Sequence, residues 1–277
     1  MIIVYIFMNM RQGEMNMPKL TREQIAIETG EKLVNWIKNY FADNGNPETN
    51  AIIGMSGGKD SLIAAALCVK ALGKDRVIGV MMPDGEQKDI SDARAAITYL
   101  GFDGGEINIR GIVEEFYGSL GDYISLDNSV ITNVPPRVRM TVLYGLAAGA
   151  NARVVNTSNL SERYVGWTTK WGDSVGDLAP LAELTVRELL DIGKYYLDLP
   201  KDLLFKTPDD GMSGKSDEEA LGFSYEELDD YILDHKYPSA EKLSLIKKRN
   251  KESAHKRNAI PVFSPHGYFF KPSRDWF

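Results

Sequence analysis

A glycine-rich turn between two apolar runs most constrains how this chain can fold. The turn, GMSGGKDS at residues 54–61, follows an apolar stretch that predicts a buried strand and precedes one that predicts a helix. Glycines at such a junction let backbone N–H groups converge, and the positive end of the following helix favours an anion. Strand, turn and helix in this order predict an anion-binding site in an α/β fold.

Strand and helix patterns alternate on both sides of this turn. Predicted strands cover residues 51–55, 76–82, 105–109 and 153–157, and predicted helices cover 21–41, 60–72, 90–100 and 134–150. Thr21 and Gln24 form a capping box for the first helix, and Pro135 and Pro136 suit the first turn of the last. The alternation predicts a parallel sheet with helices on both faces, binding ligands at the carboxyl ends of its strands.

The C-terminal half has a different pattern. A glycine- and aromatic-rich loop at 167–182 precedes helical patterns at 185–197, 225–234 and 239–257, and a polar stretch at 206–222 predicts a mobile cover over a site. We expect one domain over residues 18–277. Residues 1–17 lack the basic start and cleavage site of a signal peptide, so we interpret them as a disordered segment or an extension from an upstream start codon.

Composition restricts the partners. A net charge of -7 argues against general affinity for nucleic acid, and the apolar runs are too short to cross a bilayer. The only cysteine, Cys68, cannot form an intramolecular disulfide, and no Cys/His cluster offers a zinc site. We therefore expect a cytoplasmic protein with neither a nucleic acid nor a membrane as partner.

The glycine turn is not a Walker A loop, because its first glycine is one residue too close and Asp60 replaces the hydroxyl residue. It can still bind phosphate through the amides of Gly57 and Gly58 and the hydroxyls of Ser56 and Ser61. Asp60 would repel phosphate unless it held a Mg²⁺ ion that bridges phosphate oxygens. The alternative is a plain strand-to-helix turn in which Asp60 faces the helix dipole.

The segment SGGKDS resembles the SGGxDS signature of the pyrophosphate-loop ATPases, which cleave ATP between its α and β phosphates. Four further stretches, in order, resemble ammonia-dependent NAD synthetase: NLSE at 159–162, TKWGD at 169–173, SDEEALG at 216–222 with LDDY at 228–231, and HKR at 255–257. The likeness runs from about residue 25 to residue 257. It implies an α/β fold with Rossmann-like layers of the adenine nucleotide α-hydrolase type, followed by C-terminal helices.

The resemblance also implies a reaction. ATP would adenylate the nicotinate carboxylate of deamido-NAD, and ammonia would displace AMP to give NAD, with pyrophosphate released in the first step. Mg²⁺ would be the cofactor, ATP the co-substrate and a homodimer the working form. Residues 113–120 and 138–148 are apolar enough for a dimer interface, although they could equally be core. No part of the chain supplies a glutaminase, so the nitrogen would come as free ammonia or from a separate protein.

The same resemblance assigns residues to roles. Asp60 and Glu162 would hold Mg²⁺, and Asp173 would accept a proton near the incoming ammonium. The implied ATP contacts are Gly54, Met55, Ser56, Gly57, Gly58, Lys59, Asp60, Ser61, Thr157, Arg187 and Thr207. The implied deamido-NAD contacts are Arg137, Lys170, Asp177, His255 and Lys256.

The chain departs from the family pattern in one place. The family's ATP-contacting lysine aligns with Val186, so either the neighbouring Arg187 substitutes for it or the contact is absent. The family's substrate arginine matches Arg137 better than Arg139, although a surface salt bridge is an alternative role for Arg137. Two other functions share the glycine turn: a tRNA-modifying adenylating ligase, which the acidic charge disfavours, and a nucleotide sensor without turnover, which the pair Asp60 and Glu162 disfavours.

Overall fold

The computed structural model describes residues 20–87, 90–205, 217–261 and 263. Its sheet contains β1 (Asn50–Gly54), β2 (Val77–Met81), β3 (Asp103–Glu106) and β4 (Ala152–Val154), all parallel, in the order β3-β2-β1-β4. The chain steps outward from β1 to β3 and then returns to the other side of β1 at β4. The strand order therefore reverses between β1 and β4, and ligands bind at the carboxyl ends of the strands at such a point.

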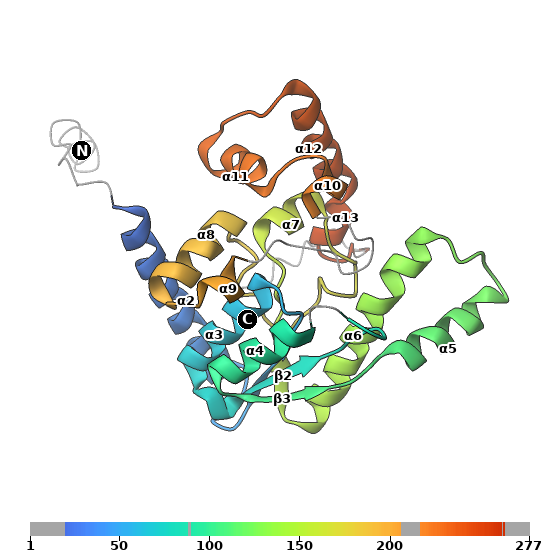
Figure 1. The fold of residues 1–277 in the computed structure, drawn as a ribbon, viewed down its shortest axis with the longest axis horizontal. Helices are drawn as coiled ribbons and strands as arrows, with labels where there is room; N and C mark the ends of the chain where they lie inside the picture. Colours follow the sequence, from blue (N-terminus) through green and yellow to red (C-terminus); the bar gives the residue numbers. More distant parts are fainter. Residues whose placement is uncertain (1–19, 88–89, 206–216, 262, 264–277) are drawn as a thin grey trace.

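One face of the sheet is covered by α2 (Arg22–Asp43), α3 (Lys59–Leu72) and α4 (Ile90–Leu100), with the short η1 (Lys74–Arg76) leading into β2 (Figure 1). The predicted capping box of Thr21 and Gln24 starts α2 and is confirmed. Helix α3 lies at the centre of the core, since Ile63 and Leu67 have no exposed surface. Burying one such side chain contributes about 1.5–3 kcal/mol, so α3 is fixed firmly against the sheet.

The opposite face is covered by α5 (Arg110–Gly121) and α6 (Asn128–Gly149). Ile52 and Val80 from the sheet pack there against Val113 and Val138. The predicted parallel sheet with helices on both faces is therefore confirmed. The connected ends of α5 and α6 project beyond the sheet as an arm (Figure 1).

Helix α6 begins earlier than its proline pair indicated. Asp127 caps it by accepting a hydrogen bond from the Val130 amide, so Pro135 and Pro136 lie inside the helix and not in its first turn. A proline has no N–H, and Pro135 therefore leaves the carbonyl of Ile131 without its helical donor. The hydroxyl of Tyr117 on α5 donates to that carbonyl at 2.9 Å. The neighbouring helix thus satisfies the group that the proline would otherwise orphan.

The third strand is also displaced from its predicted position at 105–109. Strand β3 is an exposed edge strand, and the apolar residues that suggested a buried strand lie just after it. The amides of Ile107 and Ile109 still donate to the carbonyls of Met81 and Pro83, both at 2.9 Å. Ile109 is fully buried on the α5–α6 side, which explains why its segment resembled a core strand.

A C-terminal layer of helices follows β4 in the chain (Figure 1). It consists of α7 (Leu160–Val165), α8 (Val186–Asp191), the π-helical η2 (Ile192–Tyr196), α9 (Lys201–Leu204), α10 (Asp217–Leu221), α11 (Tyr225–Asp234), α12 (Ala240–Glu252) and α13 (Ala254–Arg257). Of these helices, α8, η2 and α9 pack against α2 and α3. The predicted helix at 239–257 is broken at Ser253, and the pattern at 185–197 is a helix that continues as a π-helix. Much of this layer shares a core around Val165, Phe223 and Leu228.

Two predicted segments cannot be compared with the fold. Residues 1–17 and most of the predicted cover, residues 206–216, lie outside the described part of the chain. Across the described part, no helix combines the length and apolar character needed to cross a membrane.

Candidate active site

The glycine turn is held open by its own hydroxyl groups. The Ser61 hydroxyl donates to the carbonyl of Gly58 at 3.0 Å and accepts from the amide of Ser56 at 3.3 Å. The Ser56 hydroxyl accepts from the amide of Gly58 at 3.2 Å, and Gly57 has a φ of +86°, a conformation that favours glycine. No side chain caps α3 at Gly58, so no capping side chain occupies the place at the start of the helix where an anion could bind.

The carboxylate of Glu162, on α7, lies close to that of Asp60, which lies in the glycine turn. Asn159 forms a capping box with Glu162: the Glu162 amide donates to Asn159 Oδ1 at 2.9 Å, and the Asn159 amide donates to Glu162 Oε2 at 3.1 Å. Asn159 Nδ2 also donates to Asp60 Oδ1 at 3.3 Å. Burial, and then the charge of Asp60, raise the pKa of Glu162 well above its ordinary value. This acidic pair therefore requires a positive charge beside it.

Lys59 provides that charge in this structure. Its ammonium nitrogen lies 2.9 Å from Asp60 Oδ2, and its side chain is only 7% exposed. A magnesium ion suits the same position, because Mg²⁺ in proteins is held by one or two carboxylates together with substrate phosphates. Within the described ranges no group of three or more His, Cys, Asp or Glu residues could hold a metal alone. Asp60 and Glu162 would thus hold Mg²⁺ only with help from phosphate oxygens and water.

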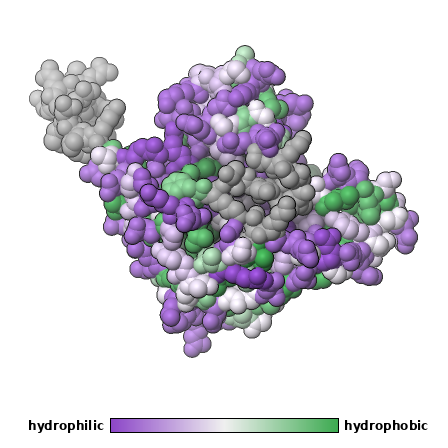
Figure 2. Space-filling model, viewed as in Figure 1, coloured by the Kyte–Doolittle hydropathy of each residue, from purple (hydrophilic) through white to green (hydrophobic). Residues whose placement is uncertain are grey.

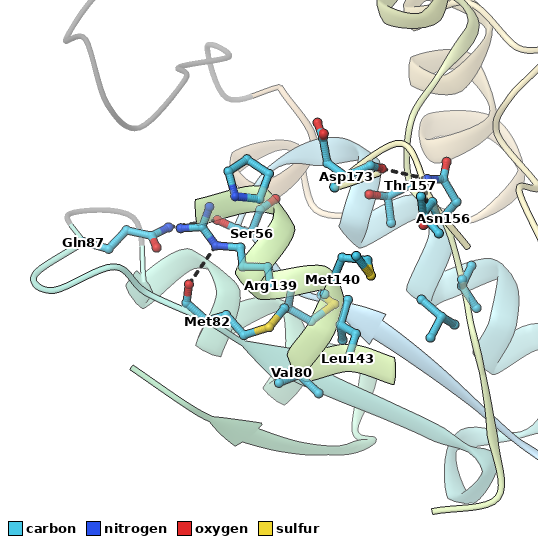
Figure 3. A pocket seen from close by; sticks show the side chains of 17 residues that line it. Ser56, Val80, Met82, Gln87, Arg139, Met140, Leu143, Asn156, Thr157 and Asp173 are labelled. Carbon is cyan, nitrogen blue, oxygen red and sulfur yellow. Dashed lines mark hydrogen bonds between the residues drawn. The ribbon is translucent and has the colours of Figure 1, made fainter. Parts of the chain in front are cut away.

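A cavity opens at the point where the strand order reverses (Figure 3). Gly54, Met55 and Ser56 line it from the end of β1, and Thr157 and Asp173 line it from beyond β4. Val80, Met82, Met140 and Leu143 give it an apolar wall. An apolar cavity with a few polar groups at its rim suits a nucleoside beside the phosphate-binding turn.

Asp173 lies in this cavity with its carboxylate restrained. Its Oδ1 accepts a hydrogen bond from the amide of Thr169 at 2.6 Å. Its backbone carbonyl accepts one from Asn156 Nδ2 at 2.7 Å (Figure 3). Burial raises the pKa of Asp173, while the Thr169 amide and the cations Lys256 and Arg139 oppose the rise. A carboxylate with a raised pKa is better suited to accept a proton near neutral pH than an ordinary aspartate.

The two arginines of α6 point into different spaces. Arg139 lines the cavity, where its Nε donates to the carbonyl of Met82 at 2.9 Å and its guanidinium lies between Gln87 and Ser56 (Figure 3). Arg137 is exposed and lines a separate groove between α5 and α6. Residues two positions apart on a helix lie on different faces, so only one arginine can face the glycine turn. The sequence favoured Arg137 over Arg139 as the substrate arginine, and of the two it is Arg139 that lines this cavity.

The remaining substrate candidates lie around the loop after α7. Arg137 Nε donates to the carbonyl of Lys170 at 3.3 Å, which joins two of them. Lys256 Nζ donates to the carbonyls of Gly166 at 2.8 Å and Thr168 at 2.6 Å, and its neighbour His255 is exposed.

Asp177 is occupied by structural contacts at the end of β4. It accepts hydrogen bonds from the Val154 amide at 2.7 Å and from the Tyr144 hydroxyl at 3.4 Å. Its contact with a substrate remains a prediction.

The position of the family's ATP lysine holds no cation. Val186 is buried in the core of the C-terminal layer. The Arg187 guanidinium lies 2.7 Å from Asp230 and 3.0 Å from Asp234, so it would have to leave both carboxylates to contact ATP. Thr207, another residue predicted to contact ATP, is outside the described residues.

A parallel sheet with an anion-binding turn at its reversal point, faced by two carboxylates, defines an α/β enzyme of the pyrophosphate-loop type. The NAD synthase family model matches residues 29–260, and the chain belongs to the NAD synthase family.

Individual relatives agree with this assignment. The chain is 39% identical over 251 residues to the NH(3)-dependent NAD(+) synthetase of Thermococcus kodakarensis, covering 86% of this chain and 95% of the relative. Among solved structures, it resembles an NMN synthetase from Francisella tularensis with a TM-score of 0.79 and 33% identity, covering 90% of this chain and all of the other. It also resembles an NH3-dependent NAD synthetase from Campylobacter jejuni, with a TM-score of 0.69, 26% identity, and coverage of 86% and 99%.

Proposed function

We propose that this chain amidates deamido-NAD to NAD, using ATP and ammonia and releasing AMP and pyrophosphate. The observation that carries the proposal is the meeting of Asp60 and Glu162 at the open N-terminus of α3. Simple nucleotide binding needs the amides of the turn but not a second buried carboxylate beside them. That pair favours metal-assisted cleavage of a triphosphate over binding alone.

The first step joins the two substrates. A carboxylate oxygen of the nicotinate group attacks the α-phosphorus, the bond from that phosphorus to the bridging oxygen breaks, and pyrophosphate leaves. Asp60 and Glu162 would hold Mg²⁺, which supplies neutralisation of the charge on the departing pyrophosphate. The amides at the start of α3 would orient the phosphates, and Arg139, which lines the same cavity as Ser56, would neutralise charge on the α-phosphate.

The second step forms the C–N bond. Ammonia attacks the carbonyl carbon of the acyl adenylate, AMP leaves, and Asp173 takes the proton released from nitrogen. The shell of cations around the loop at 166–177, including Lys170, Lys256 and Arg137, would hold the anionic dinucleotide. Positioning and charge neutralisation account for the chemistry without a covalent enzyme intermediate.

The direct test supplies the purified protein with ATP, Mg²⁺, deamido-NAD and ammonium. We expect equal amounts of AMP and NAD, and at least about a 100-fold loss of rate in Asp60→Asn. Replacing ammonium with glutamine should leave only background product. Release of ADP in place of AMP would contradict the adenylation mechanism.

The similarity to an NMN synthetase favours a second candidate substrate, the mononucleotide of nicotinic acid. This molecule carries the same reacting carboxylate but lacks the adenylate half of deamido-NAD. Parallel measurements of kcat/KM on the two substrates decide between them. A higher value for deamido-NAD supports the first proposal, and a higher value for the mononucleotide supports the second.

We infer that the arm formed by α5 and α6 joins two copies of the chain. Phe116 and Ile112 on α5 and Ile124 and Ile131 near the start of α6 are each 46–50% exposed, and Figure 2 shows apolar residues gathered on this arm. A contiguous apolar patch exposed on a protein surface commonly marks a protein–protein interface. The groove beside it contains Arg137, so a second copy would help to enclose the substrate that this arginine contacts.

Light scattering on Phe116→Asp tests the dimer. A charge at the centre of the patch should raise the dissociation constant by about 100-fold or more. Glu115→Lys changes charge at an exposed position of the same helix without entering the apolar patch, and should leave the mass unchanged. A wild-type protein that is monomeric at micromolar concentration would refute the proposal.

The cysteine fits a cytoplasmic location, which we propose on that ground. Cys68 is fully buried, and burial raises the pKa of its thiol to about 12. A thiol of this kind is unreactive and needs no oxidising compartment.

A further inference from the structure

The site lacks a cation where its family has one, and a second cation stands across the same cavity. Val186 and Lys59 both line a space bounded by α3, α8 and α11, together with Tyr225. Arg187 lines it too, but its guanidinium is engaged by Asp230 and Asp234. Arg22 and Lys194 line the same space, but Arg22 is paired with Asp191 at 2.8 Å, and Lys194 Nζ donates to the Tyr195 hydroxyl at 3.0 Å. Of the cations that line this space, Lys59 is the one that begins α3 within the glycine turn.

Lys59 occupies an electrostatically unusual position. It begins α3, where the helix dipole opposes a positive charge, and its side chain is almost wholly buried. Its ammonium nitrogen lies 2.9 Å from Asp60 Oδ2, so a carboxylate offsets the cost of burying the charge. The ammonium also lies 5.6 Å from the centre of the Tyr225 ring, which favours a cation. The acidic pair and the ring together keep Lys59 charged inside the protein.

The ammonium and a metal ion compete for the same oxygen. Lys59 Nζ lies 2.9 Å from Asp60 Oδ2, and a Mg²⁺ ion on Asp60 would repel an ammonium at that distance. A lysine has a flexible four-carbon side chain, and the cavity shared with Val186 gives its ammonium an alternative position.

We propose that Lys59 is an exchangeable cation. It neutralises Asp60 and Glu162 when no metal is bound, and it moves to the triphosphate when Mg²⁺ and ATP arrive, replacing the lysine that the family carries at position 186. The proposal rests on the proposed function, because it requires ATP and Mg²⁺ to bind at this turn. Lys59 would therefore compete with Mg²⁺ for the Asp60 carboxylate, and it would contact phosphate once Mg²⁺ and ATP are bound.

Lys59→Met tests both roles, because methionine keeps an unbranched side chain and removes the charge. Calorimetry with Mg²⁺ and a non-hydrolysable ATP analogue should show affinity about 10–100-fold weaker than in the wild type. Mn²⁺ binding without nucleotide, followed by electron paramagnetic resonance, should become at least about threefold tighter. A lysine that only paired with Asp60 would show the tighter Mn²⁺ binding without the loss of ATP affinity, so both shifts together are required.

A second substitution tests the exchange of position. Val186→Lys in the Lys59→Met background should recover ATP affinity to within about threefold of the wild type. Val186→Met in the same background is the matched control, since it lengthens the side chain without a charge and should recover nothing. Thermal melts verify that each variant is folded; if Val186→Lys does not fold, the two readouts on Lys59→Met decide alone.

The outcomes separate this inference from the proposed function. If wild-type protein binds no ATP and forms no AMP, the proposed function fails. If wild-type protein amidates its substrate normally but Lys59→Met leaves either ATP affinity or nucleotide-free Mn²⁺ affinity unchanged, the exchange is overturned and the proposed function stands. If both shift as stated but the charged and uncharged substitutions at 186 behave alike, the replacement of the family's lysine is overturned.

Discussion

The two sides of the acidic pair are held in place by different kinds of interaction. Asp60 lies on α3, whose residues from Leu62 to Cys68 are all buried in the main apolar core. Glu162 lies on α7, which places Val165 in the smaller apolar core of the C-terminal layer and is also held by polar contacts, such as that of the Tyr164 carbonyl, which accepts from Asn250 Nδ2 at 2.8 Å. The first side depends mainly on the hydrophobic effect, and the second combines a smaller apolar core with hydrogen bonds and charges.

A second polar anchor connects α7 with α8 and α11. The Ser161 hydroxyl donates to Asp229 Oδ1 at 2.5 Å, and the Arg187 amide donates to Asp229 Oδ2 at 2.8 Å. Ser161 also accepts from the Val186 amide at 3.1 Å. Because the site needs both carboxylates, this contrast implies that its geometry is adjusted from the α7 side, where pH and salt can act, while the α3 side stays fixed.

Leu67→Ala should give the largest loss in the free energy of unfolding, because it removes part of a buried side chain from the apolar core around α3. Leu67 is fully buried, and a cavity in a tightly packed core costs about 2–5 kcal/mol. Urea unfolding measures the loss. Ile25→Ala, at a position 48% exposed on α2, is the control and should cost less than about 1 kcal/mol. Similar losses for the two variants would remove the contrast between core and surface on which the comparison rests.

Gly166→Ala should disturb the polar side through the backbone. Gly166 has a φ of +68°, and an added methyl group would overlap the Cβ of Ser253 at the junction of α12 and α13. We expect a loss of about 2–4 kcal/mol in the free energy of unfolding, together with a higher KM for the dinucleotide, because Lys256 donates to the Gly166 carbonyl.

Gly101→Ala provides the matched control for that substitution. Gly101 has a φ of +71° but no atom within 4 Å of the added methyl group, so it carries the backbone strain without the overlap. Its cost should be about 1–2 kcal/mol with no change in KM. Equal effects for Gly101 and Gly166 would show that contact with Ser253 is unimportant.

Asp229→Asn should expose the pH sensitivity of the polar side. Burial raises the pKa of Asp229 to about 6, so the folded state binds this proton more tightly than the unfolded state does. Wild-type stability from this group is therefore lost as pH rises from about 4 through 6. Asparagine does not titrate. The free energy of unfolding of Asp229→Asn, relative to that of the wild type, should therefore increase by about 1–3 kcal/mol over that pH range. Urea unfolding at several pH values measures the difference; a constant difference would contradict the assignment.

Lys242→Met should have the smallest effect. Lys242 Nζ lies 2.6 Å from Glu227 Oε1, and their hydrogen bond holds the pKa of Glu227 below its ordinary value. The pair is partly exposed, so its loss should cost less than about 1 kcal/mol and should shrink in high salt. Chemical unfolding at low and high salt checks this. A larger, salt-independent loss would mean that this pair anchors α11 to α12 more strongly than a surface ion pair does.

Sequence patterns predicted the fold where local signals agreed with tertiary packing. The capping box at Thr21 and the apolar runs around the glycine turn specified α2, β1 and α3 almost to the residue. The start of α6 was wrong because a proline signals a helix start only if no neighbour can satisfy the freed carbonyl. The hydroxyl of Tyr117, on another helix, does so here.

The site was less predictable than the fold. The family motifs brought Asp60 and Glu162 together correctly, because the strands that precede them, β1 and β4, are parallel neighbours whose carboxyl ends lie at the same edge of the sheet. The sequence preferred Arg137 to Arg139, since helix spacing does not reveal which of two arginines faces a cavity. It gave no role to Asn159, since a capping residue gives no sign that its side-chain amide also reaches a carboxylate. Contacts of this kind depend on how distant elements are oriented, which local sequence does not record.

The proline pair in α6 has a mechanical consequence. Two successive residues without N–H groups remove two rungs of the helix ladder between the outer turns, which carry Ile131, and the inner turns, which carry Arg139. The helix backbone is therefore weaker at this point than on either side of it. The proposed dimer contact at the tip and the guanidinium beside the glycine turn therefore lie on opposite sides of a weakened stretch of helix.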